Sequence, residues 1–532
     1  MQQNNQYTYN QPPMGQMMPP PQMGMPPQMG PARPSGWRER WMHRFGMDML
    51  NRTETFIFPN WLIGKSIVFF FVAMIACWGA FGFVPEFDLW IVAALSVVLF
   101  FYGSSALSKE WTRKSDKAFV RNIFIAGFVI RILWVLYCYF VFNPSHFDNT
   151  YGSGADVDWY IPFGKDITQW IAGDSKMTLS QILDYNGSGM DDSGYSFWLG
   201  IVYFVFGVEN EIFIPFLLKC LMGAYCAVSI YHIAKRHFGN GVARMAAIFI
   251  CVNPNMIYWS GAMMKEAEMI FLCCLAIDNF DRVLSSGQRY TFKTLLPGVL
   301  SGLALMFFRA PLAILIFLSV FAHIVMASGR VMSIGKKIIA GALVASVLAV
   351  SVGDRIQQES RQLLDSARSK ERQEENLEFR ANREGGNSFA KYAGTAVFAP
   401  LIFTIPFPTF NSAQEGQLTQ IQLSGGSYIK NILSFFVIIV MFLLLISGEW
   451  RRHVFILAYT VGYHVILVFS SYAQSGRFHM PVWPMFLLFA AYGIQLAKTN
   501  AKFKKWFPIA LVVEVAICLF WNWYKLKGRG MI

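Results

Sequence analysis

The chain has 532 residues, of which 55% are hydrophobic and only 14% are charged, whereas an ordinary soluble domain has roughly 25% charged residues. Mean hydropathy is +0.38 and the hydrophobic residues form long runs, so the chain is predicted to be a polytopic membrane protein, which excludes a cytosolic enzyme and a secreted disulfide scaffold. The formal charge of +13 comes from short Lys and Arg clusters between those runs, as in cytoplasmic loops. The sequence has no basic stripe interleaved with aromatic residues, so nucleic-acid binding is not expected.

The N-terminal segment, residues 1–58, is expected to be a cytoplasmic tail. Residues 1–35 are rich in Gln, Met, Pro and Gly and cannot bury a hydrophobic core, so they are predicted to be disordered. The following residues add four arginines and two tryptophans, a composition typical of a segment on a membrane surface. A solvated basic linker is the alternative.

The hydrophobic runs predict an all-α fold with about 13 transmembrane helices, since a span needs roughly 20 mostly apolar residues. Pro311, beside Arg309, marks a turn between two short helices. The runs are 61–84, 88–107, 121–142, 211–234, 242–259, 266–283, 292–308, 310–327, 336–352, 427–447, 452–471, 478–497 and 506–524.

The basic clusters predict the orientation of these helices. The loop at 108–121 carries five Lys or Arg residues and is assigned to the cytoplasm. Most other clusters then fall on the same side, with the tail after residue 524 as the exception. Two long loops face outward. Loop 143–193 has eight Asp, two Lys and neither Glu nor Arg, a net charge of −6, and loop 353–426 is predicted to hold an in-plane amphipathic helix and a re-entrant or interfacial segment.

The acidic loop contains the first candidate site residues. Asp156 and Tyr160 lie four residues apart and share a face if this segment is helical, with Asp158 between them. Because the segment follows a spanning helix, we expect the Asp156 carboxylate at the membrane–water boundary, where it can reach a lipid-borne substrate. The alternative is that the aspartates only solvate an outer loop.

Two further groups are expected at the same outer level. Lys265 and Glu266 join two spans, and ionisable residues in such places are costly and therefore functional candidates; a snorkelling turn is the alternative. Arg477, followed by His479, departs from the positive-inside pattern and needs an anionic partner, for which phosphate matches the guanidinium group. Arg309 lies near this level. A helix anchor at the lipid headgroups is the alternative for Arg477.

Carboxylates and cations on one outer face suit the transfer of a group from a lipid phosphate. A carboxylate can take the proton of the incoming hydroxyl, while cations stabilise the leaving phosphate. Asp156 and Glu266 are therefore the predicted catalytic residues, and Arg477, Lys265 and Arg309 the predicted phosphate ligands. Carboxylate oxygens also suit Mg, Mn or Ca, so a divalent cation between Asp156 and Glu266 is a further hypothesis.

At these residues the chain resembles the glycosyltransferase C superfamily, which includes protein O-mannosyltransferases and lipid A aminoarabinose transferases. The similar pieces follow one another in the family's order. They are Arg131, Asp156 with Tyr160, Gly194-Tyr195 to Gly207, Ile233 to Gly239, Asn253-Pro254 to Glu266, Phe308 to Pro311, and Arg477 to Pro484. The family's frequent Asp-Glu pair is absent from the first loop, where Asp156 and Asp158 stand instead.

The resemblance implies an integral membrane glycosyltransferase with a polyprenyl-phosphate-linked sugar donor. The acceptor would be a glycan, lipid or protein on the periplasmic or outer face of the inner or plasma membrane, with Tyr160, Asp158, His479 and Tyr195 supporting the site. The predicted parts are the tail 1–58, a two-helix addition at 59–110, a catalytic module at 111–352 that includes an outer loop 143–210, an outer loop at 353–426 and C-terminal helices at 427–532.

Two other functional classes stay open. A flippase, transporter or polymerase-like protein for lipid-linked saccharides would carry charges inside its helices, and Lys219, Asp278 and Glu514 lie inside hydrophobic runs. A non-catalytic assembly subunit is the other class, and the N-terminal tail is the only feature of the sequence that suggests it.

Overall fold

The computed structural model describes residues 57–147, 155–186, 193–208, 212–285, 292–326, 401–411, 418–469 and 473–532, with the single residues 37, 149, 152 and 378. Every regular element in this part of the chain is a helix, which confirms the all-α class. Seven of these helices are long and hydrophobic enough to span a membrane, or eight if one bent pair is a single span. The predicted count of about 13 is therefore not confirmed.

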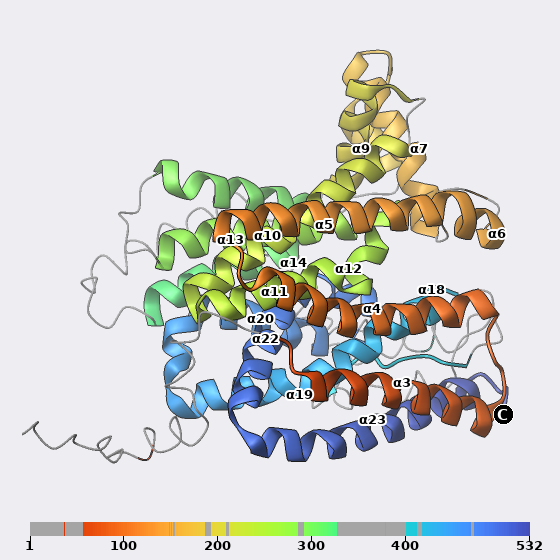
Figure 1. Ribbon diagram of the computed structural model, residues 1–532. Coiled ribbons are helices and arrows are strands. Elements are labelled where there is room, and N and C mark those ends of the chain that lie inside the picture. The colour runs from red at the N-terminus through yellow and green to blue at the C-terminus, as the bar shows by residue number, and fades with distance from the viewer. Residues whose placement is uncertain are drawn as a thin grey trace, which may run out of the picture.

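The two N-terminal helices are built into the bundle. α3 (Asn60–Phe81) and α4 (Phe87–Trp111) pack on one another, and α3 also lies beside the last helix, α23 (Ala501–Gly528), so both ends of the helical region meet (Figure 1). α4 packs on α11 (Asn240–Val252) as well. The predicted addition 59–110 is thus continuous with the core that follows.

The central module is built around α10 (Phe213–Phe238), which packs on α5 (Asp116–Tyr137), α11 and α13 (Glu266–Ser285). Gly223 of α10 leaves room for the Arg131 side chain of α5, since a Cβ at Gly223 would lie 2.9 Å from the Arg131 Cδ. The α11 span is bent by 52° before α12 (Pro254–Tyr258) and the 3₁₀ turn Trp259–Gly261. This bend brings the chain back toward the start of α13.

α14 (Phe292–Met326) contains the turn that Arg309 and Pro311 predicted. Arg309 has extended backbone, with φ −167° and ψ 97°, between two helical halves. A Cβ at Gly302 would lie 2.8 Å from the Phe317 ring, although 15 residues of straight helix would separate the two by about 22 Å. The halves therefore fold against one another, and Arg309 lies at the turn between them.

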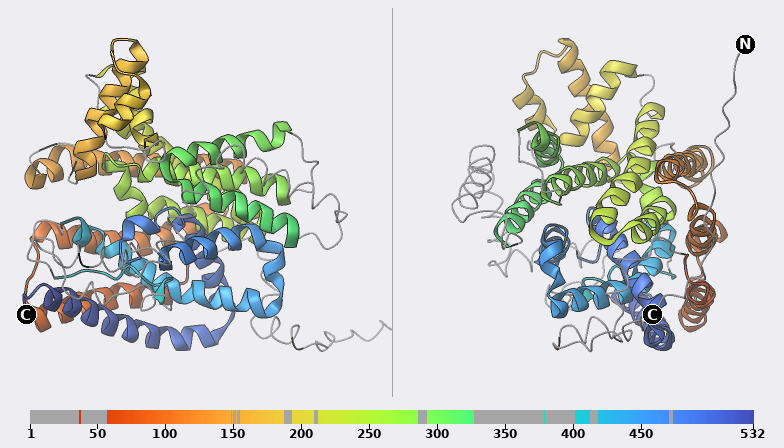
Figure 2. Two further views of the ribbon diagram at one scale, coloured as in Figure 1. Left: turned by 180° about the vertical axis from the view of Figure 1, so that it is seen from behind. Right: turned by 60° about the vertical axis from the view of Figure 1, so that its left-hand side comes forward.

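The acidic loop is largely helical. After the π-helical turn Cys138–Phe142 and α6 (Asn143–Phe147), α7 (Ala155–Ala172) packs on α9 (Gly194–Phe206), with the short α8 (Leu179–Tyr185) between them in the chain. Figure 1 and both views of Figure 2 show α7 and α9 projecting from the bundle, across the direction of the long helices. The helix predicted around Asp156 is therefore present.

The C-terminal helices pack against α14 and against the central module. They are α18 (Leu418–Gln422), α19 (Ser424–Ser447), the 3₁₀ turn Glu449–His453, α20 (Val454–Phe469), α21 (Gly476–His479) and α22 (Trp483–Thr499), followed by α23. α20 packs on α14, and α22 packs on α19 and α11. These contacts join the C-terminal helices to the central module.

Several predictions concern residues outside the described ranges. The predicted span 336–352 lies there, as do nearly all of the tail 1–58 and the amphipathic segment 356–384. Only the end of the predicted re-entrant segment 393–410 is described. From 401 it consists of a 3₁₀ turn followed by residues without regular structure, and the side chains of Ile405 and Phe410 are buried.

Candidate active site

Arg477 joins the two carboxylates that the sequence singled out. Its Nε donates to Oε1 of Glu266 and its Nη1 donates to Oδ2 of Asp156, the latter at 2.5 Å. The exposure of the three side chains differs, since Glu266 is 1% exposed, Arg477 20% and Asp156 45%. The site therefore has a buried carboxylate at its base and a solvent-accessible one at its rim.

Three separate helices supply these side chains. Asp156 lies in the first turn of α7, Glu266 is the first residue of α13, and Arg477 lies in the one-turn helix α21. Carboxylates at helix N-termini are stabilised by the backbone dipoles there. The residues are 321 and 211 positions apart along the chain, so only the packing of the bundle creates the site.

The other two predicted cations lie beside this triad. The Arg309 guanidinium carbon is 4.4 Å from the ring centroid of Phe478, the neighbour of Arg477. Lys265 is 3% exposed, and its Nζ lies 6.0 Å from the ring centroid of Tyr160. Burial, and next the positive charge of Arg309, lowers the pKa of Lys265 to about 8. All five predicted residues are thus brought together.

The net charge of this cluster favours an anion. Arg477, Arg309 and Lys265 supply three cations against the two carboxylates of Asp156 and Glu266, a formal excess of one positive charge. Two of the five N–H groups of the Arg477 guanidinium are directed at carboxylates, which leaves three for another acceptor. A phosphate group matches that combination of charge and donors.

The aromatic candidates form one wall of the site. Tyr160 is buried one turn after Asp156, and its ring meets that of Tyr195 edge to face at 4.8 Å. Burial, with the nearby Glu266 carboxylate, raises the pKa of Tyr160 well above its ordinary value, so its hydroxyl is a hydrogen-bond donor at neutral pH. Asp158 is exposed and does not join the cluster.

A glycine sets the position of this wall against α14. A Cβ at Gly194 would lie 2.8 Å from the backbone of Phe307, close to the α14 turn. Only glycine allows α9 to approach so closely, and Tyr195 follows immediately. This close contact explains why a glycine precedes Tyr195 in the segment that resembles the family.

Lys219 and Glu268 form a buried pair beneath the site that sequence reasoning did not assign to it. The Lys219 Nζ lies 3.0 Å from Glu268 Oε2, both side chains are 2% exposed or less, and Lys219 also donates to the Met264 carbonyl at 2.5 Å. Lys219 lies over the Tyr195 ring, 4.7 Å from its centroid. This pair fixes the first turn of α13, which carries Glu266.

The charge within the run 211–234 was visible in the sequence, but its partner was not. Lys219, with Asp278 in the run 266–283 and Glu514 in the run 506–524, supported the transporter alternative. In the structure Lys219 pairs with Glu268, and the Asp278 carboxylate lies 2.6 Å from Arg236. Both charges therefore take part in interhelical ion pairs.

His479 is buried away from the triad, although it is only two residues after Arg477. Its Nε2 lies 2.7 Å from the Ala473 carbonyl and its Nδ1 lies 2.9 Å from the Nζ of Lys430. Lys430 also donates to the Ile405 carbonyl. His479 therefore holds the turn that presents Arg477, and the buried Lys430 was not foreseen as its partner.

The predicted divalent cation between Asp156 and Glu266 stays a prediction. In this structure the Arg477 guanidinium contacts both carboxylates. Within the described ranges a different group of three, Glu86, Asp88 and His146, brings possible ligand atoms within 4.8 Å of one another. It lies where α3 leads into α4 and where α6 ends, outside the Arg477 cluster.

Residues 166–356 match the model of the Alg9-like mannosyltransferase family, a glycosyltransferase C type family of membrane enzymes. The predicted resemblance is confirmed. The match supports glycosyltransferase activity in a membrane. It includes Glu266, Lys265 and Arg309, whereas Asp156 and Arg477 lie outside it. No curated protein matches the chain.

Proposed function

We propose that the protein transfers a sugar from a polyprenyl-phosphate donor to a hydroxyl of a glycan, lipid or protein acceptor on the outer face of its membrane. The Alg9-like mannosyltransferase match makes mannose the first sugar to test. The observation that carries the proposal is the Arg477 guanidinium between Asp156 and Glu266, with Lys265 and Arg309 beside it.

Asp156 is the proposed general base. Its carboxylate, nearly half exposed, takes the proton of the acceptor hydroxyl as that oxygen bonds to the anomeric carbon. The bond from this carbon to the donor phosphate breaks, and its electron pair leaves with the phosphate. The charge that grows on the phosphate faces the free N–H groups of Arg477, which stabilise the transition state more than the ground state.

Glu266 is proposed to hold Arg477 in place and to line the floor of the site. One of its oxygens accepts from Arg477, while Oε2 is buried without a hydrogen-bond partner among the described residues. A buried carboxylate oxygen without a donor is costly. A hydroxyl of the sugar donor, bound there, would supply one.

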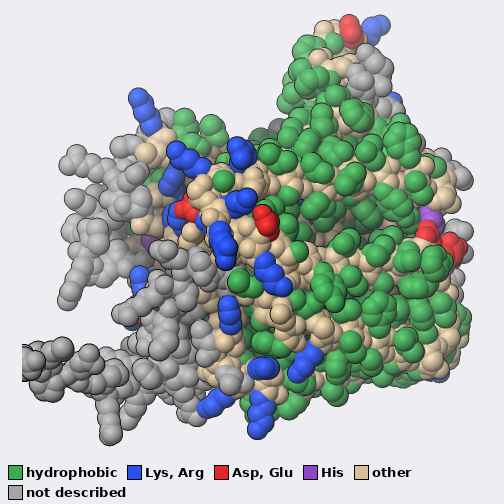
Figure 3. Space-filling view, in the orientation of Figure 1, with side chains coloured by type: hydrophobic (Ala, Val, Ile, Leu, Met, Phe, Trp, Pro, Cys, Tyr) green, Lys and Arg blue, Asp and Glu red, His purple; other side chains and the backbone are tan. Residues whose placement is uncertain are grey.

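The charges at the opposite end of the bundle support the proposed outer location. Glu266 begins α13, whose 20 residues extend about 30 Å toward the end that carries the basic loops. Most Lys and Arg side chains gather toward one end of the face seen in Figure 3, acidic and His side chains lie at the opposite end, and hydrophobic side chains cover most of the surface between them. Basic loops are typically cytoplasmic, which leaves the Arg477 cluster for the outer face.

The test of this function uses sealed right-side-out membrane vesicles that contain the protein. Radiolabelled polyprenyl-phosphate mannose should give labelled products that an impermeant lectin reaches from outside, whereas a nucleotide-linked mannose should give none. Vesicles without the protein are the control. Donor that crosses the membrane with no sugar transferred would contradict the proposal and support a transporter, and product found only inside would reverse the orientation.

Lys265 predicts a pH dependence of donor affinity. With its pKa lowered to about 8, Lys265 is charged at pH 7 and loses its charge as the pH rises through 8, so the attraction for phosphate is lost at alkaline pH. We expect the donor KM to rise between about pH 7 and pH 9. Arg stays charged throughout this range, so Lys265→Arg should flatten the rise. The measurement is the donor KM of the wild-type protein and of Lys265→Arg across this pH range. The same pH dependence of KM in both proteins would show that Lys265 does not hold the phosphate.

A further inference from the structure

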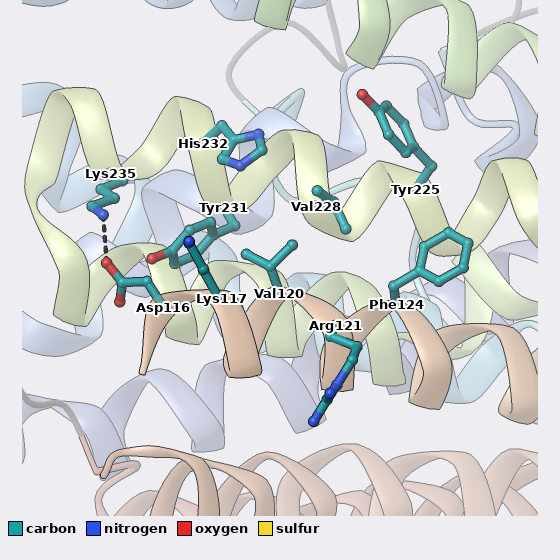
Figure 4. Close-up of a pocket in the computed structure, with 10 residues that line it drawn as sticks. All are labelled: Asp116, Lys117, Val120, Arg121, Phe124, Tyr225, Val228, Tyr231, His232 and Lys235. Carbon is teal, nitrogen blue, oxygen red and sulfur yellow. Dashed lines mark hydrogen bonds and ion pairs between the residues drawn. The ribbon is translucent and has the colours of Figure 1, made fainter. Parts of the chain in front are cut away.

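The groove between α5 and α10, at the end of the bundle away from Arg477, is lined by ten residues around a cavity of about 600 Å³ (Figure 4). α5 begins here and α10 ends here. Glu266 of the Arg477 site begins α13, and Asp281, 15 residues further along α13, pairs with Arg236 near the end of α10, so this end of α10 lies about 22 Å from the site. The lining residues are Asp116, Lys117, Val120, Arg121, Phe124, Tyr225, Val228, Tyr231, His232 and Lys235.

The lining changes from charged to apolar along both helices. On α5, Lys117 and Arg121 come first and Phe124 follows, about 10 Å deeper than Lys117. On α10, Lys235 is nearest the helix end, and Val228 lies two turns inward. Figure 4 shows Lys117 and Lys235 at one end of the groove and Phe124 and Tyr225 at the other, while the Arg121 side chain extends from α5 away from α10. A ligand that fits must have an anionic head and a hydrophobic chain.

The acid in the groove is already neutralised. Asp116 accepts from Lys235 at 2.5 Å, from Arg244 at 2.8 Å and from Asn240 at 3.0 Å. Lys117 and Arg121 are exposed, one turn apart on the same face of α5, and neither has an ion-pair partner within the described ranges. Lys117 at the mouth of the groove, with Arg121 one turn further along α5, is therefore left for an anion that the protein itself does not supply there.

We propose that this groove binds an anionic phospholipid of the membrane leaflet on the basic side, with its phosphate on Lys117, one turn from the exposed Arg121. An acyl chain would lie along Val120, Phe124 and Val228. Basic pockets between membrane helices on the cytoplasmic side are suited to acidic headgroups. The lipid would bridge α5 and α10, whose packing carries the central module.

The experiment uses the full chain in vesicles of phosphatidylcholine and a phosphatidylglycerol that carries a photoreactive group in its acyl chain. Cross-links should map to α5 and α10 in the groove, and phosphatidylcholine with the same photoreactive chain should label these peptides at least tenfold less. Lys117→Gln with Arg121→Gln should raise the half-saturating amount of phosphatidylglycerol about tenfold, whereas Lys117→Arg with Arg121→Lys should leave it within about twofold.

The matched control removes two exposed cations from the same basic region but outside the groove, Lys109→Gln with Arg113→Gln. It should leave the cross-links unchanged. Equal loss in this control would show a general surface attraction and overturn the proposal. Equal labelling by both lipids would also overturn it. Millimolar inorganic phosphate that abolishes the labelling would assign the cations to a free phosphate instead of a lipid.

Discussion

Replacing Asp156 by Asn should lower the transfer rate about 100-fold or more, the range that general-base catalysis contributes. The amide keeps the size of the carboxylate and still offers an oxygen to Arg477, so expression and folding should be unchanged. Because Asp156 is 45% exposed, the variant leaves no buried charge unpaired. Single-turnover kinetics with saturating donor measure the chemical step directly.

The fall should be in kcat, with the donor KM changed less than about threefold. This separates a base from a residue that only positions Arg477, because displacement of Arg477 would weaken donor binding first. Asp158→Asn is the matched control, an exposed aspartate two residues away on the same helix, and should keep full activity. Near-normal turnover in Asp156→Asn would remove the base assignment.

Glu266 is a poorer choice for the same experiment. Its side chain is 1% exposed and paired with Arg477, and breaking a buried pair costs about 3–5 kcal/mol. A variant there changes stability together with activity. The two carboxylates therefore differ in what their replacement can show, although both contact the same guanidinium.

The parts of the site that followed from sequence were those with a local cause. Asp156 and Tyr160 share a helix face because they are four residues apart, and the Arg309–Pro311 pair marked the turn in α14. An arginine predicted on the outer side was expected to need an anionic partner, and the structure places two carboxylates on Arg477. In each case composition and spacing near one residue were sufficient.

The parts that sequence could not supply depend on long-range packing. Lys219 was interpreted as support for a transporter, and Lys430 was not singled out from the sequence. The packing of the bundle places Glu268 beside Lys219 and His479 beside Lys430. The number of spans was also not recoverable, because a hydrophobic run does not distinguish a full span from a bent one such as α11 with α12. Hydropathy records composition along the chain, whereas these features depend on which helices meet.

Arg477 should be the residue whose replacement is hardest to compensate. The guanidinium is shared between two carboxylates through Nε and Nη1, and the remaining N–H groups are proposed to hold the leaving phosphate. That phosphate is weakly basic, so its departure needs charge stabilisation and no general acid. Loss of one fixed donor to a transition-state anion typically costs about 100- to 1,000-fold in rate.

Arg477→Lys should therefore stay at least about 100-fold impaired, because the ammonium keeps the charge but loses the planar fork. The Glu266 carboxylate keeps a cationic neighbour in this variant, so the fold should persist, which a thermal unfolding measurement checks. Arg477→Ala leaves Glu266 buried and unpaired and is expected to be less stable. Comparing the two variants separates loss of the fork from loss of the fold.

Chemical rescue decides between a phosphate ligand and a helix anchor. With a water-soluble donor analogue, added guanidinium at millimolar concentration should restore part of the rate of Arg477→Ala, and methylammonium should restore less, since only guanidinium reproduces the paired N–H groups. An anchor at the lipid headgroups would depend on the covalent link to α21, so guanidinium in solution would not replace it. Full transfer rate and full donor affinity in both Arg477→Lys and Arg477→Ala would show that the phosphate is held elsewhere.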